Sequence, residues 1–295
     1  MSGEEVQQHF RMTDGFNLFY RRWRASAGVE RVVVCIHGGG DHSGWFSVIG
    51  PVLAEDGSEV YALDLRGFGN SKEEGLPGGD TSSFERHLQD IDEAIGHARL
   101  NHPGKKVYML GHSLGGCYAI WQAANHPDSL DGLVLVAPGI VVRAMNTRKD
   151  SIELFIANLF VPRRMYDPHA SSFQEGRDPE DIKIMLQDPL NASKLSFRYL
   201  AAIKKTLVDG ALKNASHIQK PTLILQGEAD RQALPHGARR LYEELGTKDK
   251  TLQTFADAGH WFYDAFLPSL PRAKHDPAKR ERLFSIVKDW LRIHK

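Results

Sequence analysis

The stretch Gly111-His112-Ser113-Leu114-Gly115 constrains this chain more than any other, because a glycine stands two positions from the serine on each side. The segment before it, 106–110, is short, apolar and β-prone, whereas 114–124 has the composition of a helix. We therefore expect Ser113 on a sharp turn between a strand and a helix, where glycines avoid the neighbouring backbone. The first N–H groups of that helix would point, unpaired, toward an anion formed beside the serine.

The composition describes a globular chain, since its 295 residues have zero formal net charge and ordinary apolar content. The charge balance argues against nucleic acid as a main partner. The two cysteines, Cys35 and Cys117, lie in apolar segments, which favours buried thiols and a cytoplasmic location. Residues 1–8 do not resemble a signal peptide, and the longest apolar run, 133–142, is shorter than the ~20 residues that span a bilayer.

Strand and helix patterns alternate along most of the chain. Apolar and polar residues alternate over 6–24 around the Asp14-Gly15 turn, which predicts an antiparallel hairpin. The later apolar runs predict strands buried in a parallel sheet, with helical spacing between them. These runs are 31–36, 60–64, 106–110, 132–137, 221–226 and 251–255. We therefore predict one α/β sheet with an antiparallel start and helices on both faces.

The strand pattern disappears between residue 139 and about residue 219, where helical patterns are broken by prolines. This predicts a helical cap at 140–219, inserted after the sixth strand of a core domain formed by 1–139 and 220–295. Within it, 152–161 is strongly apolar and includes Phe155 and Phe160. That segment either packs on the sheet domain or lines an acyl tunnel above Ser113 and contacts lipid aggregates.

A serine hydroxyl needs a base to take its proton and a carboxylate to orient that base. Functional groups gather at the carboxyl ends of parallel strands, and Asp230 and His260 each follow a predicted strand. We therefore predict Ser113, Asp230 and His260 as a catalytic triad. Asp257 remains a rival acid, because it lies close to His260 in the sequence.

The other acids and histidines have simpler explanations. Asp64 stands at a strand end and is expected to accept hydrogen bonds from the turn at 66–71. His87, His97 and His102 lie on or just after a predicted surface helix, where we expect them to be solvated. His112 must point away from Ser113 on so tight a turn.

The glycine loop His37-Gly38-Gly39-Gly40 offers backbone N–H groups at the end of another strand. The Gly39 and Leu114 amides are the expected oxyanion donors, and the alternative is that the glycines serve only packing. The sequence has no helical zinc-binding pair of histidines, no C-x-x-C and no phosphate-binding glycine motif. We therefore expect neither metal, nucleotide nor other cofactor.

Three motifs resemble those of one family of serine α/β-hydrolases, the monoacylglycerol lipase and lysophospholipase group related to serine aminopeptidase S33. Residues 37–44 are similar to its HGxGEHSG, 64–71 to its D-x-x-G-x-G-x-S, and 111–116 to its GHSMGG. Residues 177–179, 188–190 and 226–230 also resemble family landmarks, the last bearing the acid. The resemblance implies the α/β-hydrolase fold with eight strands, and it supports the same triad and oxyanion donors.

The chain departs from the family's glyceride lipases on the side that binds the alcohol. Asp41 and Trp45 stand where those lipases tend to carry Glu and Arg, and Tyr263 stands where His is common. The resemblance implies a carboxylic ester hydrolase acting on medium to long acyl esters. We expect it to need no cofactor, and we expect Asp41, Trp45, Tyr263, Phe155 and Phe160 to contact the substrate. A lysophospholipase, another esterase, an amidase or a lactonase stays open, as does a ligand-binding protein without catalysis.

Overall fold

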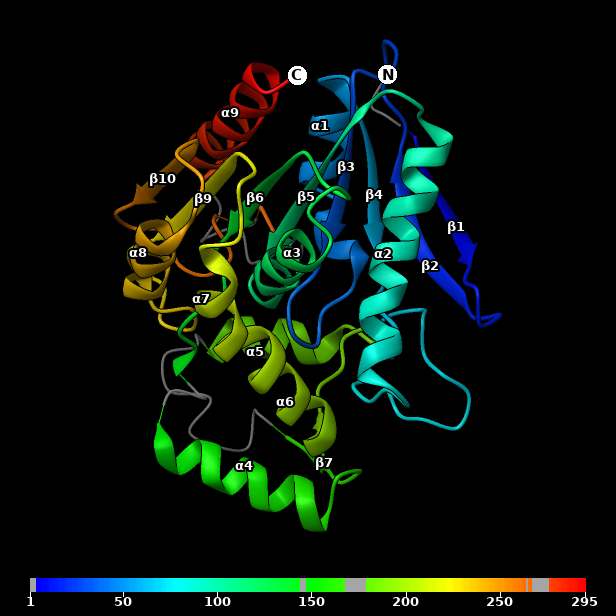
Figure 1. Ribbon diagram of the computed structural model, residues 1–295, viewed down its shortest axis with the longest axis vertical. Helices are drawn as coiled ribbons and strands as arrows, with labels where there is room; N and C mark the ends of the chain where they lie inside the picture. The colour runs from blue at the N-terminus through cyan, green and yellow to red at the C-terminus, as the bar shows by residue number, and fades with distance from the viewer. Residues whose placement is uncertain (1–3, 144–146, 168–178, 264, 267–275) are drawn as a thin grey trace.

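The computed structural model describes residues 4–143, 147–167, 179–263, 265–266 and 276–295. Its centre is an eight-stranded sheet in the order β1-β2-β4-β3-β5-β6-β9-β10 (Figure 1). β1 and β2 run antiparallel, β2 is antiparallel to β4, and the remaining pairs are parallel, which confirms the predicted antiparallel start. The strands are β1 (Glu5–Arg11), β2 (Asn17–Trp23), β3 (Arg31–Ile36), β4 (Ser58–Leu63), β5 (Lys106–His112), β6 (Gly132–Val136), β9 (Thr222–Gly227) and β10 (Lys250–Phe255).

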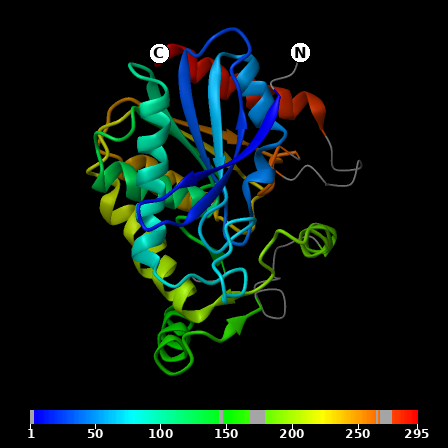
Figure 2. The same cartoon turned by 90° about the vertical axis from the view of Figure 1, so that its right-hand side faces the viewer.

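Helices cover both faces of this sheet (Figures 1 and 2). Alternate residues of β3 enter two separate apolar cores, Val34 on one face and Val33 on the other, as expected of a strand buried on both sides. The first core is covered by α2 (Phe84–Asn101), α3 (Leu114–Asn125) and α8 (Pro235–Glu244), and the second by α1 (Ile49–Glu55) and α9 (Pro277–Ile293). In the described ranges we find no helix with the length and apolar character needed to cross a bilayer.

The segment between β6 and β9 is mainly helical. It contains α4 (Arg148–Phe160), α5 (Pro179–Gln187), α6 (Phe197–Ile203), a π-helical segment (Lys204–Val208) and α7 (Asp209–Ala215). The sequence did not predict the small antiparallel pair β7 (Met165–Tyr166) and β8 (Leu195–Ser196), because two-residue strands are too short to show a period. Of the family landmarks, Arg177 and Asp178 lie outside the described residues.

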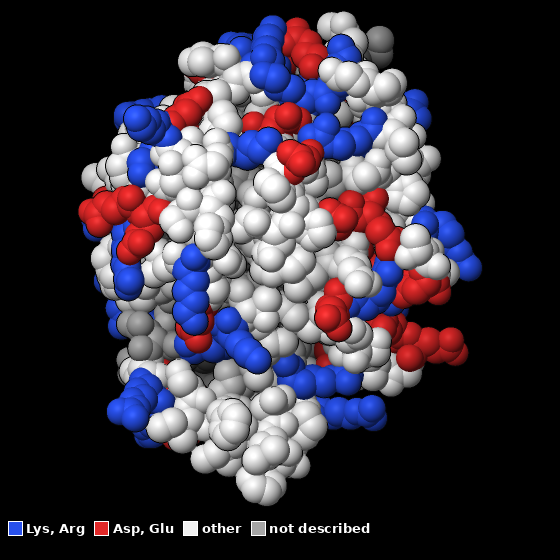
Figure 3. Space-filling model, in the orientation of Figure 1, with Lys and Arg blue, Asp and Glu red and all other residues white. Residues whose placement is uncertain are grey.

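The two ends of this segment differ in burial. Leu200 and Leu207 join the main apolar core beneath α3, whereas α4 has no buried residue. Figure 1 shows α4 at the end of the molecule opposite the two termini, and Figure 3 shows that this end is largely uncharged. The exposed apolar side chains there are Ile152, Phe155, Ile156, Leu159, Phe160 and Val161.

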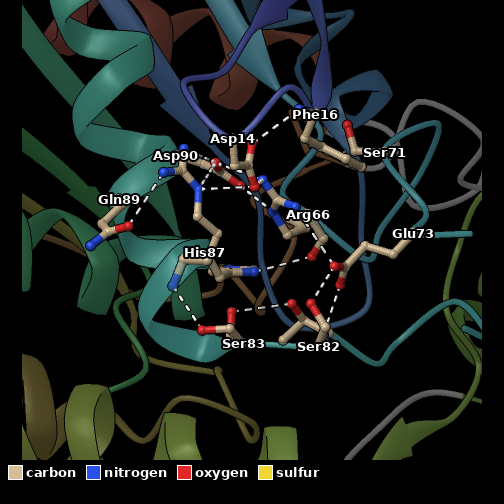
Figure 4. A network of polar contacts seen from close by, with 12 residues as sticks. Asp14, Phe16, Arg66, Ser71, Glu73, Ser82, Ser83, His87, Gln89 and Asp90 are labelled. Atoms are coloured by element: carbon tan, nitrogen blue, oxygen red, sulfur yellow. Dashed lines mark hydrogen bonds and ion pairs between the residues drawn. The ribbon is translucent and has the colours of Figure 1, made fainter.

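A buried ion network holds the loop that leaves β4 (Figure 4). Arg66 donates to both oxygens of Asp90 at 2.6 and 3.0 Å, and to Asp14 at 2.8 Å. Arg86 also donates to Asp90, at 2.9 Å. Because Asp14 belongs to the first hairpin turn and Asp90 to α2, one guanidinium joins three distant segments. Removing one partner of so buried a pair leaves an uncompensated charge, which is strongly destabilising.

His87 is fully buried, so the expectation that it is solvated was wrong. It lies three and four residues before Asp90 and Ile91, which places it on the inward face of α2. Its Nδ1 donates to the Arg66 carbonyl at 3.1 Å, and its Nε2 accepts from the Tyr118 hydroxyl at 2.7 Å. Burial lowers the pKa of His87 to about 3, and it likewise lowers the pKa of His112 to about 3 and of His37 to about 4.

These buried neutral histidines predict acid-sensitive folding. Between the ordinary pKa of ~6.5 and the lowered folded values, the unfolded chain binds more protons, so stability falls as pH falls. At pH 5 each such histidine costs about 2 kcal/mol relative to pH 7. We expect His87→Gln to lower stability at pH 7 but to make the loss between pH 7 and 5 smaller by roughly that amount. Urea unfolding at each pH measures this.

His236→Gln is the control for this experiment, because His236 is exposed. It should leave the pH dependence of unfolding as in the wild type. If His87→Gln also left that dependence unchanged, His87 would not be neutral in the folded state.

Candidate active site

Ser113 sits between β5 and α3 with a backbone φ of 56°, in the left-handed region that side chains rarely adopt. The glycines beside it are required by close backbone contacts. A Cβ at Gly111 would lie 2.2 Å from the Gly115 carbonyl oxygen, and one at Gly115 would lie 2.0 Å from that of Ile36. The turn is held in place by the Ser113 amide, which donates to the Val136 carbonyl at 2.9 Å.

Ser113, His260 and Asp230 form a continuous chain of hydrogen bonds. The Ser113 Oγ lies 3.0 Å from His260 Nε2, and His260 Nδ1 lies 2.7 Å from Asp230 Oδ2. The second oxygen of Asp230 accepts the Gln232 and Ala233 amides at 2.8 and 3.0 Å. Asp230 and His260 are buried, whereas Ser113 is partly exposed. With a proton on Nδ1, the Nε2 atom is free to accept the serine proton.

The rival acid, Asp257, lies elsewhere and is exposed. Its carboxylate accepts the Tyr263 hydroxyl at 2.5 Å and pairs with the Lys279 ammonium of α9. The hydrogen bond from Lys279 lowers the pKa of Asp257. Partial burial, and then the neighbouring Asp257, raise the pKa of Tyr263. The Tyr263 hydroxyl therefore points to Asp257. The carboxylate that contacts His260 is that of Asp230.

The glycine loop after β3 lies directly against the serine turn. A Cβ at Gly38 would be 3.2 Å from the Ser113 Cβ, and one at Gly39 would be 3.6 Å from a methyl of Leu114. Among the residues that the structure describes, the Gly39 and Leu114 amides donate to no protein acceptor. Two N–H groups near the serine are thus available to an anion.

The sheet domain anchors this loop on its inner side. His37 Nδ1 donates to the Gly38 carbonyl at 2.8 Å, and His37 Nε2 accepts the Leu65 amide at 3.0 Å. Asp64 accepts the Ser43 amide at 2.6 Å and the Asn70 amide at 2.7 Å. The expectation that Asp64 is a structural acceptor for the following turn is confirmed, and the same carboxylate also holds the chain at Ser43, just after the glycine loop.

Asp41 and Trp45 lie in and after this loop, and both are buried. The Asp41 carboxylate folds back over Gly38, since a Cβ there would be 2.4 Å from Asp41 Oδ2. The Trp45 indole N–H donates to Asn191 Oδ1 at 3.1 Å, and its ring packs on Trp261 with centroids 4.7 Å apart. Asp41 thus lies against Gly38, which adjoins Ser113, and Trp45 packs on Trp261, which adjoins His260.

Phe155 and Phe160 do not join this cluster. Their side chains are 66% and 75% exposed on α4, where no residue is buried. The expectation that they line a tunnel wall above Ser113 is therefore not met in this arrangement, because the apolar face of α4 points to solvent. The alternative expectation of a helix packed on the sheet domain holds only for Leu154, which is partly buried against the main apolar core.

His112 and Trp261 support the histidine loop, and neither was proposed from the sequence. His112 Nε2 donates to the His260 carbonyl at 3.0 Å, while its ring stacks on Phe266 at 4.8 Å. The Trp261 ring lies 4.8 Å from that of His260. Only their adjacency to Ser113 and His260 in the sequence signals such a role. The prediction that His112 points away from the serine is confirmed.

The sequence and the fold of this chain resemble those of known proteins. A family model described as serine aminopeptidase, S33, matches residues 27–263. Monoglyceride lipase of Homo sapiens is 30% identical over 256 residues, covering 85% of this chain and 82% of that protein.

Two solved structures also resemble the whole chain. The monoacylglycerol lipase of Paleococcus ferrophilus has a TM-score of 0.77 at 29% identity, covering 94% of this chain and 99% of its own. A soluble variant of monoglyceride lipase from Saccharomyces cerevisiae, in complex with a substrate analog, has a TM-score of 0.81 at 22% identity, covering 100% and 96%, which shows a shared fold. The chain therefore belongs to the serine aminopeptidase S33 family, and it is a serine α/β-hydrolase of carboxylic esters, similar to the monoglyceride lipases.

Proposed function

We propose that this enzyme hydrolyses monoacylglycerol-like esters of medium to long acyl chains through an acyl-enzyme on Ser113. The observation that carries the proposal is the hydrogen-bonded chain from Ser113 through His260 to Asp230, with distances of 3.0 and 2.7 Å. The names of the relatives support a glyceride substrate. No part of the proposed chemistry needs a cofactor.

Acylation follows from these atoms. His260 Nε2 accepts the serine proton as Ser113 Oγ attacks the ester carbonyl carbon, and the imidazolium is stabilised by the Asp230 carboxylate. The carbonyl oxygen becomes an anion, which the Gly39 and Leu114 amides bind. His260 then gives the proton to the alcohol oxygen as the C–O bond breaks. Water repeats the sequence on the acyl-enzyme and releases the carboxylic acid.

In this proposal residues 140–219 act as a cap on the core domain formed by 1–139 and 220–295. The exposed apolar face of α4 supports contact with a lipid aggregate, because apolar patches of this kind mark interaction surfaces. Arg163 and Arg164 follow that face and are also exposed. They favour an anionic surface, and they make lysophospholipid the second candidate substrate.

The nucleophile is tested by Ser113→Ala. The variant should fold with an unchanged melting temperature, and kcat for a p-nitrophenyl ester should fall about 10⁴- to 10⁶-fold because no acyl-enzyme forms. The wild type should also be labelled by a fluorophosphonate at Ser113. Turnover near the wild-type level in the variant would refute the proposal.

The acid is tested by comparing Asp230→Asn with Asp257→Asn. We expect the first to lower kcat about 10⁴-fold, because an amide cannot hold the required tautomer of His260 or stabilise its cation. Asp257→Asn should change kcat less than about threefold, since Asp257 bonds to Tyr263 and Lys279 instead. The opposite ranking would assign the role to Asp257.

The α4 surface is tested by the double substitution Phe155→Ser and Phe160→Ser. Both side chains are mostly exposed, so stability should change little, while binding to lipid vesicles and turnover of aggregated long-chain monoacylglycerol should fall about tenfold or more. Hydrolysis of a soluble short-chain p-nitrophenyl ester should stay as in the wild type. Vesicle sedimentation and the two assays measure this, and equal loss on both substrates would contradict it.

A further inference from the structure

A segment of the insertion, residues 188–192, is bonded to the outer side of the glycine loop. The Ala192 amide donates to the Gly40 carbonyl at 2.7 Å. The Trp45 indole donates to Asn191 at 3.1 Å, and Asp188 Oδ2 lies 2.9 Å from His42 Nε2. The 188–192 segment therefore holds the loop at three points between residues 40 and 45.

The approach of these two segments is tight. Gly40 has a φ of 93°, and a Cβ added there would lie 2.9 Å from the Ala192 carbonyl oxygen. The loop cannot shift outward without displacing Ala192. Its inner side is already held by His37 and Asp64, so the 188–192 segment closes the remaining side.

The 188–192 segment is itself ordered by internal hydrogen bonds. Asp188 Oδ1 accepts the Leu190 amide at 2.9 Å, and the Asp188 carbonyl accepts the Asn191 amide at 3.2 Å. Asn191 Nδ2 donates to the Met185 carbonyl of α5 at 3.1 Å. Asn191 thus joins α5 to Trp45 through the two ends of one amide group, and a shift of α5 reaches the glycine loop through it.

We propose that Asp188 and Asn191 are positioning residues for the oxyanion hole, which aim the Gly39 N–H by holding the loop between residues 40 and 45. This inference rests on the proposed function, in which Gly39 binds the oxyanion. Its consequence is that the oxyanion hole depends on the insertion. Full stabilisation of the transition state requires the hydrogen bonds between residues 188–192 and residues 40–45. The ground-state ester carbonyl needs that N–H far less than the tetrahedral anion does.

The experiment uses Asn191→Ala, Asp188→Ala and the conservative Asp188→Asn. Loss of one oxyanion donor costs about 10²- to 10³-fold in kcat, so a displaced donor should cost about 10- to 100-fold, with KM changed less than about threefold. An alkyl boronic acid, whose tetrahedral adduct with Ser113 occupies the hole, should lose affinity by the same factor. His42 Nδ1 accepts the Gly44 amide, so His42 Nε2 donates to Asp188. Asp188→Asn should lose less activity than Asp188→Ala, because its one amide oxygen still accepts from either the Leu190 amide or the His42 N–H, whereas alanine accepts neither.

Arg198→Gln is the matched control. Arg198 fastens the same insertion to the core through two bonds to Asp80, at 2.7 and 2.6 Å, on a loop outside residues 37–45. Its loss should lower the melting temperature at least as much as Asn191→Ala, yet leave kcat and boronate affinity within about threefold of wild type. This separates loss of positioning from loss of stability.

The inference fails if Asn191→Ala and Asp188→Ala keep wild-type kcat and boronate affinity, or if Arg198→Gln loses as much of both. The proposed function fails differently: the wild type would not bind the boronate, and Ser113→Ala would stay active. If Asn191→Ala does not fold, the comparison of Asp188→Ala with Asp188→Asn decides the question, because both retain the Asn191 contacts with Trp45 and Met185.

Discussion

The close contact between α3 and β3 is the constraint on which the rest of this structure depends. The Gly115 Cα approaches the Ile36 carbonyl so nearly that no side chain fits between them. This contact brings the start of α3 against the end of β3, and the parallel pairing of Ile36 with Gly111 keeps the ends of β3 and β5 level. Ser113 and the glycine loop therefore meet because their strands are neighbours in the sheet.

The histidine reaches the serine differently, since it follows β10 at the far edge of the sheet. Its loop crosses back toward β5 and is held there from two sides. Asp230 binds the imidazole, and His112 binds the His260 carbonyl from below the serine turn. Burial lowers the pKa of His112, so it stays neutral beside Ser113 while it holds the His260 carbonyl. The Trp261 ring, next to His260 in the sequence, packs on the rings of both His112 and His260.

The insertion combines two unlike parts. Its end beyond residue 197 shares the apolar core of the sheet domain, whereas α4 exposes most of its apolar side chains. Of α4, Leu154 packs on the main core, while α6, α7 and the hydrogen bonds of residues 188–198 attach the insertion to the sheet domain. An exposed apolar surface is thereby attached to a segment that contacts the glycine loop. Under the proposed function, contact with a lipid and the chemistry of the ester would then lie in one connected structure.

Local patterns in the sequence determined much of this protein, because neighbouring residues dictate strands, helices and turns. The apolar runs predicted the strands of the main sheet, and the glycines around Ser113 predicted its sharp turn. The spacing of His87 with Ile91 could also have revealed its burial. Only the tertiary structure decided which carboxylate meets His260, because Asp257 is drawn away by Lys279 of α9. It likewise decided that α4 faces solvent and that Asn191 meets Trp45, residues 146 apart. Contacts between distant segments depend on how whole elements pack, and no local pattern encodes them.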